Sequence, residues 1–258
     1  MRGLAGVFLA FALALPGLVF SNPASAASPF ANWAAVVVAA DNAAHGGGVT
    51  EAFDNARRDV SGRLAAMGFN PANISQFSVQ PEKYAAPRPQ KADLRGVYEQ
   101  LKATGGTAKA GCLLYFTSHG EPRGITFGEG RLSPALLAAM IEGACPGRPV
   151  IAVISACFSG VFIDPLSGPQ RMVMTAARPD RASFGCGESD KYPYFDECFL
   201  RTTETARDFV ALANGTKACV AAKEIETKAE PPSEPQVWIG GGLRPMLPLY
   251  AFTKPASP

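Results

Sequence analysis

Histidine is scarce in this chain, which has only His45 and His119 among its 258 residues. The six cysteines are scattered and form no Cys-x-x-Cys pair, so the usual ligand pattern of a zinc site is missing, and we expect no metal and no cofactor. The formal net charge is only +2 and the basic residues are spread out, which argues against binding to nucleic acid. A Gly-x-Ser-x-Gly elbow is also absent. The segment His45-Gly-Gly-Gly is therefore interpreted as a loop bordering a cleft and not as part of an esterase.

Long apolar runs are confined to the first residues. Met1 and Arg2 precede an apolar run that ends in the small residues SNPASA, and these are the parts of a secretory signal peptide. We expect cleavage after Ala26 and export to the periplasm or the cell exterior. A retained membrane anchor is the alternative, but Pro16 and Gly17 interrupt the run. No later run could span a bilayer, so we expect no membrane contact after cleavage.

Short apolar runs alternate with helical patterns through the rest of the chain. Strands are predicted at residues 33–40, 74–79, 111–116, 149–154, 171–176 and 236–240, and helices at 51–68, 93–102, 133–144 and 204–214. Asp93 and Ser133 fit as helix N-caps. This alternation predicts an α/β fold with a mostly parallel central sheet and helices on both faces, formed by residues 27–258 as a single domain.

Chemically useful residues follow two of these predicted strands. His119-Gly120 comes after one apolar run, and Cys157 comes after another. Because the carboxyl ends of parallel strands meet at one edge of a sheet, Cys157 and His119 are candidates for a nucleophile and its acid–base partner. The backbone N–H groups of Gly120 and Cys157 could then stabilise an oxyanion. The alternative is that Cys157 is a small buried apolar residue and His119 is structural.

The order of these motifs resembles a known family. LLYFTSHG (113–120) followed by VISACFSG (153–160) resembles the legumain-like cysteine peptidases, which belong to the caspase–haemoglobinase fold group. VVVAADN (36–42), MTAARPDRASFGC (174–186) and YFDECF (194–199) are similar to further segments of that family. The resemblance implies a caspase-like three-layer sandwich.

The resemblance also implies roles for individual residues. Cys157 would be the nucleophile, His119 the acid–base group, Gly120 an oxyanion donor and Asn42 the residue that orients the histidine. Ser183 and Asp196 would line the primary specificity pocket, together with Ser155, which stands where legumain has an acidic residue two positions before its cysteine.

We therefore expect an exported cysteine endopeptidase that hydrolyses peptide bonds through a thioester acyl-enzyme. The substrate would be a peptide or protein, and the oligomeric state is left open. One alternative is a transamidase of the same family, in which an amine replaces water. Another is a catalytically silent binding protein on the same fold. Export also permits disulfides, and Cys186 with Cys198 is the pair we expect.

Overall fold

A seven-stranded sheet forms the centre of the protein, seen in a computed structural model that describes residue 3 and residues 27–253. The expected signal peptide thus lies outside the described residues, except for Gly3. The strand order is β10-β9-β8-β4-β1-β2-β3, and every neighbouring pair is parallel except β10 with β9. The strands are β1 (Trp33–Ala39), β2 (Ile74–Ser78), β3 (Gln90–Lys91), β4 (Gly111–Thr117), β8 (Val150–Ser155), β9 (Arg171–Thr175) and β10 (Gln236–Ile239).

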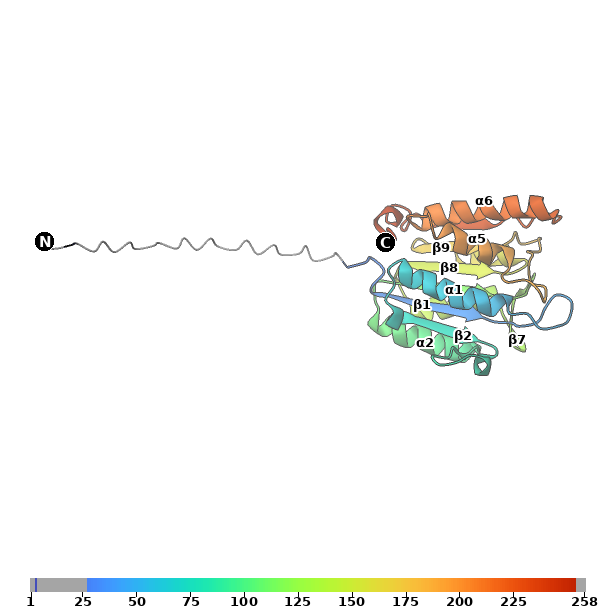
Figure 1. Ribbon diagram of the computed structural model, residues 1–258, viewed down its shortest axis with the longest axis horizontal. Coiled ribbons are helices and arrows are strands. Elements are labelled where there is room, and N and C mark those ends of the chain that lie inside the picture. Colours follow the sequence, from blue (N-terminus) through green and yellow to red (C-terminus); the bar gives the residue numbers. More distant parts are fainter. Residues whose placement is uncertain (1–2, 4–26, 254–258) are drawn as a thin grey trace.

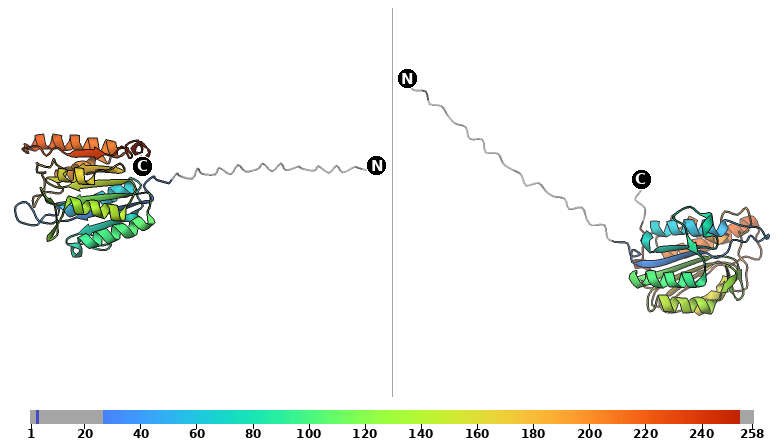
Figure 2. Two further views of the ribbon diagram at one scale, coloured as in Figure 1. Left: turned by 180° about the vertical axis from the view of Figure 1, so that it is seen from behind. Right: turned by 90° about the horizontal axis from the view of Figure 1, so that it is seen from below.

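Helices cover both faces of this sheet (Figures 1 and 2). One face packs against α1 (Ala52–Ala66), α5 (Tyr194–Thr202) and α6 (Phe209–Thr227), and the other against α2 (Leu94–Thr107), α3 (Pro134–Ala144) and α4 (Ile163–Leu166). Alternate strand residues serve the two cores, because successive side chains of a strand point to opposite faces. In β1, for example, Val36 belongs to the α2–α3 core and Val37 to the α1–α5–α6 core. The predicted three-layer α/β fold is confirmed.

The first residues of the helices show which of the predicted helix starts are correct. Asp93 accepts a hydrogen bond from the Gly96 N–H at 2.7 Å, and Ser133 accepts one from the Leu136 N–H at 3.3 Å, so both predicted N-caps are confirmed. The predicted helix over residues 204–214 exists, but its bounds were wrong, because α6 spans Phe209–Thr227. The Asp208 carboxylate caps α6, so the segment between α5 and α6 is a connection and the second helix begins only at Phe209.

A small hairpin sheet follows His119 and was not predicted. It consists of β5 (Gly120–Glu121), β6 (Gly124–Phe127) and β7 (Gly130–Leu132), all antiparallel. Ile125, Phe127 and Leu132 are buried in the α2–α3 core, so the hairpin is anchored to the domain. The 3₁₀ helices η1 (Pro71–Asn73), η2 (Pro81–Lys83), η3 (Ser159–Phe162) and η4 (Leu247–Leu249) complete the connections. None of the helices described within residues 27–253 is both long and apolar enough to cross a membrane.

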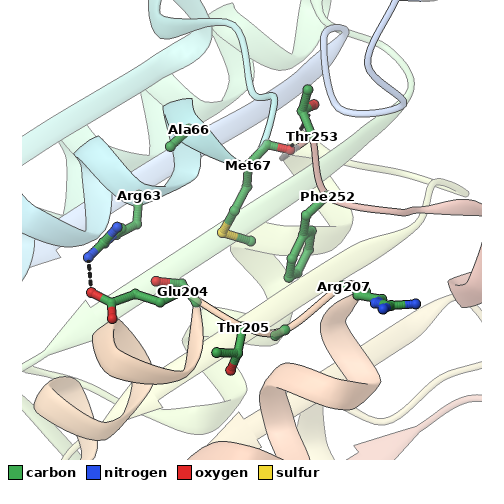
Figure 3. A pocket seen from close by; sticks show the side chains of 10 residues that line it. Arg63, Ala66, Met67, Glu204, Thr205, Arg207, Phe252 and Thr253 are labelled. Carbon is green, nitrogen blue, oxygen red and sulfur yellow. Dashed lines mark hydrogen bonds and ion pairs between the residues drawn. The ribbon is translucent and has the colours of Figure 1, made fainter. Parts of the chain in front are cut away.

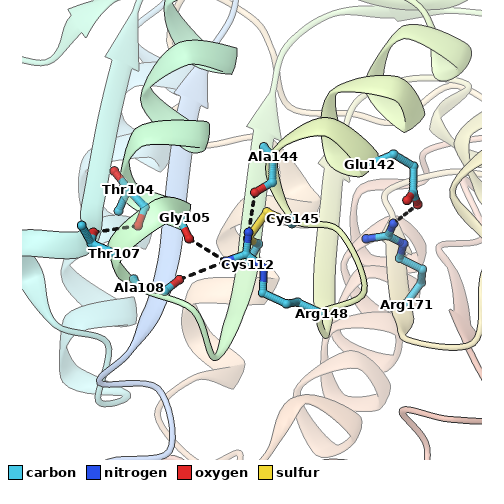
Figure 4. Close-up of a disulfide and its surroundings, with 10 residues drawn as sticks. All are labelled: Thr104, Gly105, Thr107, Ala108, Cys112, Glu142, Ala144, Cys145, Arg148 and Arg171. Atoms are coloured by element: carbon cyan, nitrogen blue, oxygen red, sulfur yellow. Dashed lines mark hydrogen bonds and ion pairs between the residues drawn. A yellow bond between two sulfur atoms is a disulfide. The ribbon is translucent and has the colours of Figure 1, made fainter.

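Two disulfides differ from the predicted pairing. Cys112 at the start of β4 is bonded to Cys145 at the end of α3 (Figure 4), and Cys198 on α5 is bonded to Cys219 on α6. The expected Cys186–Cys198 bond was wrong, because Cys198 is buried on the side of α5 that packs against α6. Cys157 and Cys186 are both free and partly exposed.

Beside the Cys112–Cys145 disulfide, the Arg148 side chain donates hydrogen bonds to several backbone carbonyls. Arg148 donates hydrogen bonds to the carbonyls of Gly105 at 2.7 Å and Ala108 at 3.3 Å, at the C-terminal end of α2 (Figure 4). It also donates to Ala144 at the end of α3. The ends of α2 and α3 are therefore held together at the edge of the sheet opposite the candidate site.

Candidate active site

The predicted nucleophile and acid–base residues follow two paired strands. β4 and β8 are adjacent and parallel, with Thr117 opposite Ser155 at their carboxyl ends. One step further, the Ser118 N–H donates to the Ser155 carbonyl at 3.1 Å. His119 and Cys157 each lie two residues beyond that last pair, so the two side chains emerge from neighbouring points on the same sheet edge.

Gly120 brings the two loops into direct contact. A Cβ atom at this position would lie 2.0 Å from the Cys157 carbonyl oxygen and 3.0 Å from the Ala156 Cβ. Only glycine allows two backbones to approach so closely. The segment that carries His119 therefore rests on the backbone of the proposed nucleophile.

The Cys157 sulfur is held by a segment that is distant in sequence. Its Sγ accepts a hydrogen bond from the Ser183 N–H at 3.2 Å, and the Ser183 hydroxyl lies 3.7 Å away. The Ser183 carbonyl, at 3.4 Å, can accept the thiol proton. These contacts orient the sulfur at the bend that follows β8. Ser183, predicted as a pocket residue, is thus in contact with the sulfur itself.

The residue after the nucleophile has an unusual backbone conformation. Phe158 has φ of 55° and ψ of 11°, in the left-handed region that a bulky side chain rarely adopts. Its N–H donates to the Arg181 carbonyl at 2.7 Å, which holds this conformation in place. Such strain is concentrated at functional sites, where surrounding contacts maintain it. Here it produces a sharp turn from β8 into η3, with Cys157 at the bend.

His119 is oriented by a backbone group. Its Nε2 lies 2.9 Å from the Ala43 carbonyl oxygen, and the Phe53 ring packs edge-on against the imidazole at a centroid distance of 5.2 Å. Since a carbonyl only accepts hydrogen bonds, the neutral imidazole must carry its proton on Nε2. Nδ1 is then the nitrogen that can exchange a proton with a thiol or a substrate.

The predicted orienting role of Asn42 is corrected by this arrangement. The Asn42 side chain donates to Gln80 Oε1 at 3.1 Å and not to the imidazole. The reason is a turn made by the preceding residue: Asp41 Oδ1 accepts from the Asn42 N–H at 2.7 Å and the Ala43 N–H at 3.0 Å. This turn directs the Ala43 carbonyl, one residue later than predicted, to His119.

Ser155 and Asp196 have a different place from the one predicted. Both were expected to line a substrate pocket, yet Ser155 is 2% exposed and Asp196 is 0% exposed. Asp196 accepts hydrogen bonds from the hydroxyls of Ser155 at 2.7 Å, Thr117 at 2.9 Å and Tyr115 at 2.5 Å. Burial raises the pKa of the Asp196 carboxyl to about 6, although the three hydroxyl donors oppose this shift. Asp196 and these three hydroxyl residues therefore form a closed polar cluster, the Asp196 cluster, beneath the strand ends.

The glycine-rich loop lies beside the site and is bound to the segment after Ser183. The His45 N–H donates to the Cys186 carbonyl at 3.0 Å, and the Thr50 hydroxyl donates to the Gly187 carbonyl at 2.9 Å. The His45 side chain is exposed. Burial raises the pKa of the Cys186 thiol to about 11, with the nearby Cys157 adding to the shift. Cys186 therefore remains a protonated thiol at neutral pH.

Figure 3 shows a separate pocket of about 520 Å³, none of whose lining residues belongs to the candidate site. It is lined by the end of α1, by residues 203–207 and by residues 252–253, with an exposed Arg63–Glu204 ion pair at 2.6 Å. Because α1 connects two parallel strands, it runs back along the sheet and ends at the opposite edge from His119 and Cys157. No group of three His, Cys, Asp or Glu side chains that could hold a metal ion is found in the described part of the chain.

Sequence patterns had missed three of these features. The Ala43 carbonyl is a backbone group, so no side-chain motif marks it, although Asp41 followed by Asn42 is a turn signal. The left-handed Phe158 has no local signal, because that region is normally occupied by glycine or asparagine. The hydroxyl partners of Asp196 become apparent only when α5 is packed on the sheet.

Comparisons with known proteins bear on the family and the fold of the chain. The model of the Peptidase C13 family matches residues 91–218, about half of the chain, and this part contains both His119 and Cys157. The crystal structure of caspase-1 from Spodoptera frugiperda has the same fold, with a TM-score of 0.58 and 14% sequence identity over 83% of this chain and 88% of that chain. A search of curated proteins found no match. The shared fold shows that the chain has a caspase-type fold, and the family match shows that it belongs to the Peptidase C13 family of legumain-like cysteine peptidases.

Proposed function

We propose that this protein is an exported cysteine endopeptidase that acts through Cys157 and His119. The observation that carries the proposal is the contact between their two loops: Gly120 rests on the Cys157 carbonyl, next to an imidazole whose Nε2 is bound to Ala43. This arrangement leaves Nδ1 available for proton transfer, and Cys157 is a partly exposed free thiol.

In the first step, Cys157 gives its proton to His119 Nδ1 and its sulfur attacks the carbonyl carbon of a peptide. The oxyanion is stabilised by backbone donors. The Cys157 N–H suits this role, because no hydrogen-bond acceptor contacts it among residues 27–253. The adjacent Gly120 N–H is the second donor that we assign.

The intermediate then collapses to a thioester. The carbon–nitrogen bond breaks as His119 returns its proton to the leaving amine. Water next attacks the thioester and gives a proton to His119, and the thiolate of Cys157 leaves and is protonated again. In a transamidase the second nucleophile would be an amine, so the same residues could serve either outcome.

Export is part of the proposal and is supported by the cysteine chemistry. Two disulfides, Cys112–Cys145 and Cys198–Cys219, suit an oxidising compartment. The N-terminal segment has the composition of a signal peptide. Expression of the full chain with its N-terminal segment, followed by mass spectrometry of the protein in the periplasm or medium, tests this. Protein that stays in the cytoplasm with residues 1–26 still attached would contradict the proposed export.

The catalytic proposal is tested with a thiol-directed acyloxymethyl-ketone probe and a mixed peptide library. We expect wild-type protein to be labelled and to cleave peptides, and Cys157→Ala to do neither. Cys186→Ala removes the other free thiol, so label that remains on this variant must be on Cys157. His119→Ala should slow acylation by about 100-fold or more.

Each remaining outcome identifies a different alternative. Cleavage by Cys157→Ala at the wild-type rate would refute the mechanism. Labelling of Cys157 without turnover of any peptide would favour the silent binding protein. Transfer of the acyl group to an added amine in place of water would identify a transamidase.

A further inference from the structure

A single buried carboxylate joins the two strands that carry the proposed catalytic residues. Asp196 comes from the first turn of α5 and has no exposed surface. Its Oδ2 accepts from Thr117 on β4 and from Ser155 on β8, while its Oδ1 accepts from Tyr115 on β4. Three hydroxyls from two strands thus converge on one side chain of a third element.

Burying the Asp196 carboxylate in this cluster costs free energy in the folded state. Within residues 27–253 no cation pairs with Asp196: its interactions are the three hydroxyl hydrogen bonds, and burial makes its ionisation harder. Burying a carboxylate without an opposite charge is unfavourable even when it is hydrogen-bonded. Replacing buried charged groups by well-packed apolar side chains is often neutral or stabilising, so the cluster calls for an explanation besides stability.

Two members of the cluster, Thr117 and Ser155, stand at equal distances along the chain from the two proposed catalytic residues. Thr117 lies two residues before His119, and Ser155 lies two residues before Cys157. Thr117 and Ser155 are also direct partners in the parallel pairing of β4 and β8. The same oxygen of Asp196 accepts from both hydroxyls, so it fixes the last paired residue of each strand immediately before the chain turns into the site.

We propose that Asp196 is a positioning residue that locks the ends of β4 and β8 together and thereby sets the placement of His119 relative to Cys157. This inference rests on the proposed peptidase function. Asp196 touches neither substrate nor the reacting atoms. It acts through the two strand ends, because a displacement of about 1 Å between reacting groups can reduce the rate of catalysis by about 100-fold.

The test removes single hydroxyls and leaves the carboxylate in place. Thr117→Val keeps the shape of the side chain and removes one of the two donors to Asp196 Oδ2, and Ser155→Ala removes the other. Thr216→Val is the matched control, because Thr216 is also fully buried and its hydroxyl donates to the Leu212 carbonyl within α6, away from the site. All three variants should unfold at lower temperatures than wild type, which a purely structural role would also predict.

The kinetic readout separates positioning from stability. We expect Thr117→Val and Ser155→Ala to lower kcat by about tenfold or more with little change in KM, and to slow alkylation of Cys157 by iodoacetamide. Thr216→Val should keep the kcat of wild type. Asp196→Asn should lower kcat further, since an amide nitrogen cannot accept hydrogen bonds from the hydroxyls. If Asp196→Asn does not fold, the hydroxyl variants still decide the question.

Two results would overturn the proposal. Folded Thr117→Val and Ser155→Ala with the kcat of wild type would show that the cluster does not position the site. A rise in KM at constant kcat would show that these side chains affect substrate binding. Failure of the proposed function is distinguishable, because it would appear in wild-type protein as the absence of both labelling and cleavage, and the positioning role would fall with it.

Discussion

Gly120 lies directly against the carbonyl of Cys157, and this contact leaves no space for a side chain. A Cβ atom would be 2.0 Å from the carbonyl oxygen, which is backbone and cannot rotate away. The close approach of the loops that carry His119 and Cys157 therefore depends on one glycine.

Gly120→Ala should separate these loops. We expect a loss of stability of about 1–3 kcal/mol from the clash and a fall in kcat/KM of about 100-fold, because His119 and the Gly120 amide would both move away from Cys157. Enzyme kinetics and urea denaturation measure the two effects. Gly106→Ala is the control, since a Cβ there meets open space on α2 and should change neither activity nor fold. Wild-type activity in Gly120→Ala would contradict the assigned contact.

Asp41→Ala should disturb the orientation of His119. Asp41 accepts from the N–H groups of Asn42 and Ala43, so its loss frees the turn that presents the Ala43 carbonyl to Nε2. We expect kcat to fall by about tenfold. Asp93→Ala removes a comparable side-chain cap, on α2, and should cost about 1 kcal/mol of stability without affecting kcat. Equal kinetic effects in the two variants would argue against a specific role for the turn.

The stability of the protein should respond to the titration of Asp196. Its folded-state pKa of about 6 is above the ordinary value of 3.8, so the folded chain binds this proton more tightly than the unfolded chain. The resulting stabilisation is fully present below about pH 3.8 and is lost as the pH rises through about 6. The pKa of Tyr115, its titratable neighbour in the cluster, is raised well above its usual value by burial and by Asp196, so this phenol stays neutral throughout.

Asp196→Asn removes this titration. In an inactive Cys157→Ala background, the unfolding free energy of the Asp196→Asn variant relative to its parent should rise by about 3 kcal/mol between about pH 3 and pH 7, from the shift of about two pKa units. Urea denaturation at several pH values measures it. A difference that stays constant over this range would show that the carboxyl of Asp196 has an ordinary pKa.

Both disulfides should contribute to stability. Replacing Cys198 and Cys219 together with alanine should lower the unfolding free energy by about 2–4 kcal/mol, because the open chain gains entropy when unfolded. The Cys112–Cys145 bond spans 33 residues instead of 21, so its removal should cost about 0.4 kcal/mol more in the chain-entropy description. Unfolding of wild-type protein with and without reductant provides the comparison. Identical midpoints would contradict the assigned bonds.

Much of the fold could be predicted from local patterns. The apolar runs of β1, β4, β8 and β9 have the length and composition of buried strands, and Asp93 and Ser133 mark their helix starts through a single capping hydrogen bond each. These signals depend on residues within one or two turns of chain, so they can be read directly. The start of α6 could not be predicted in this way, because apolar residues at helical spacing continue across the cap at Asp208.

The sequence by itself determined which residues follow the buried parallel strands, and with them the candidate pair His119 and Cys157. Only the tertiary structure decided what surrounds that pair. The Ala43 carbonyl, the Asp196 cluster and the bond between Cys198 and Cys219 each join segments that are far apart in the chain or groups that belong to the backbone. Such contacts follow from how α1, α5 and α6 pack on the sheet, and packing is a property of the whole chain that no short motif carries.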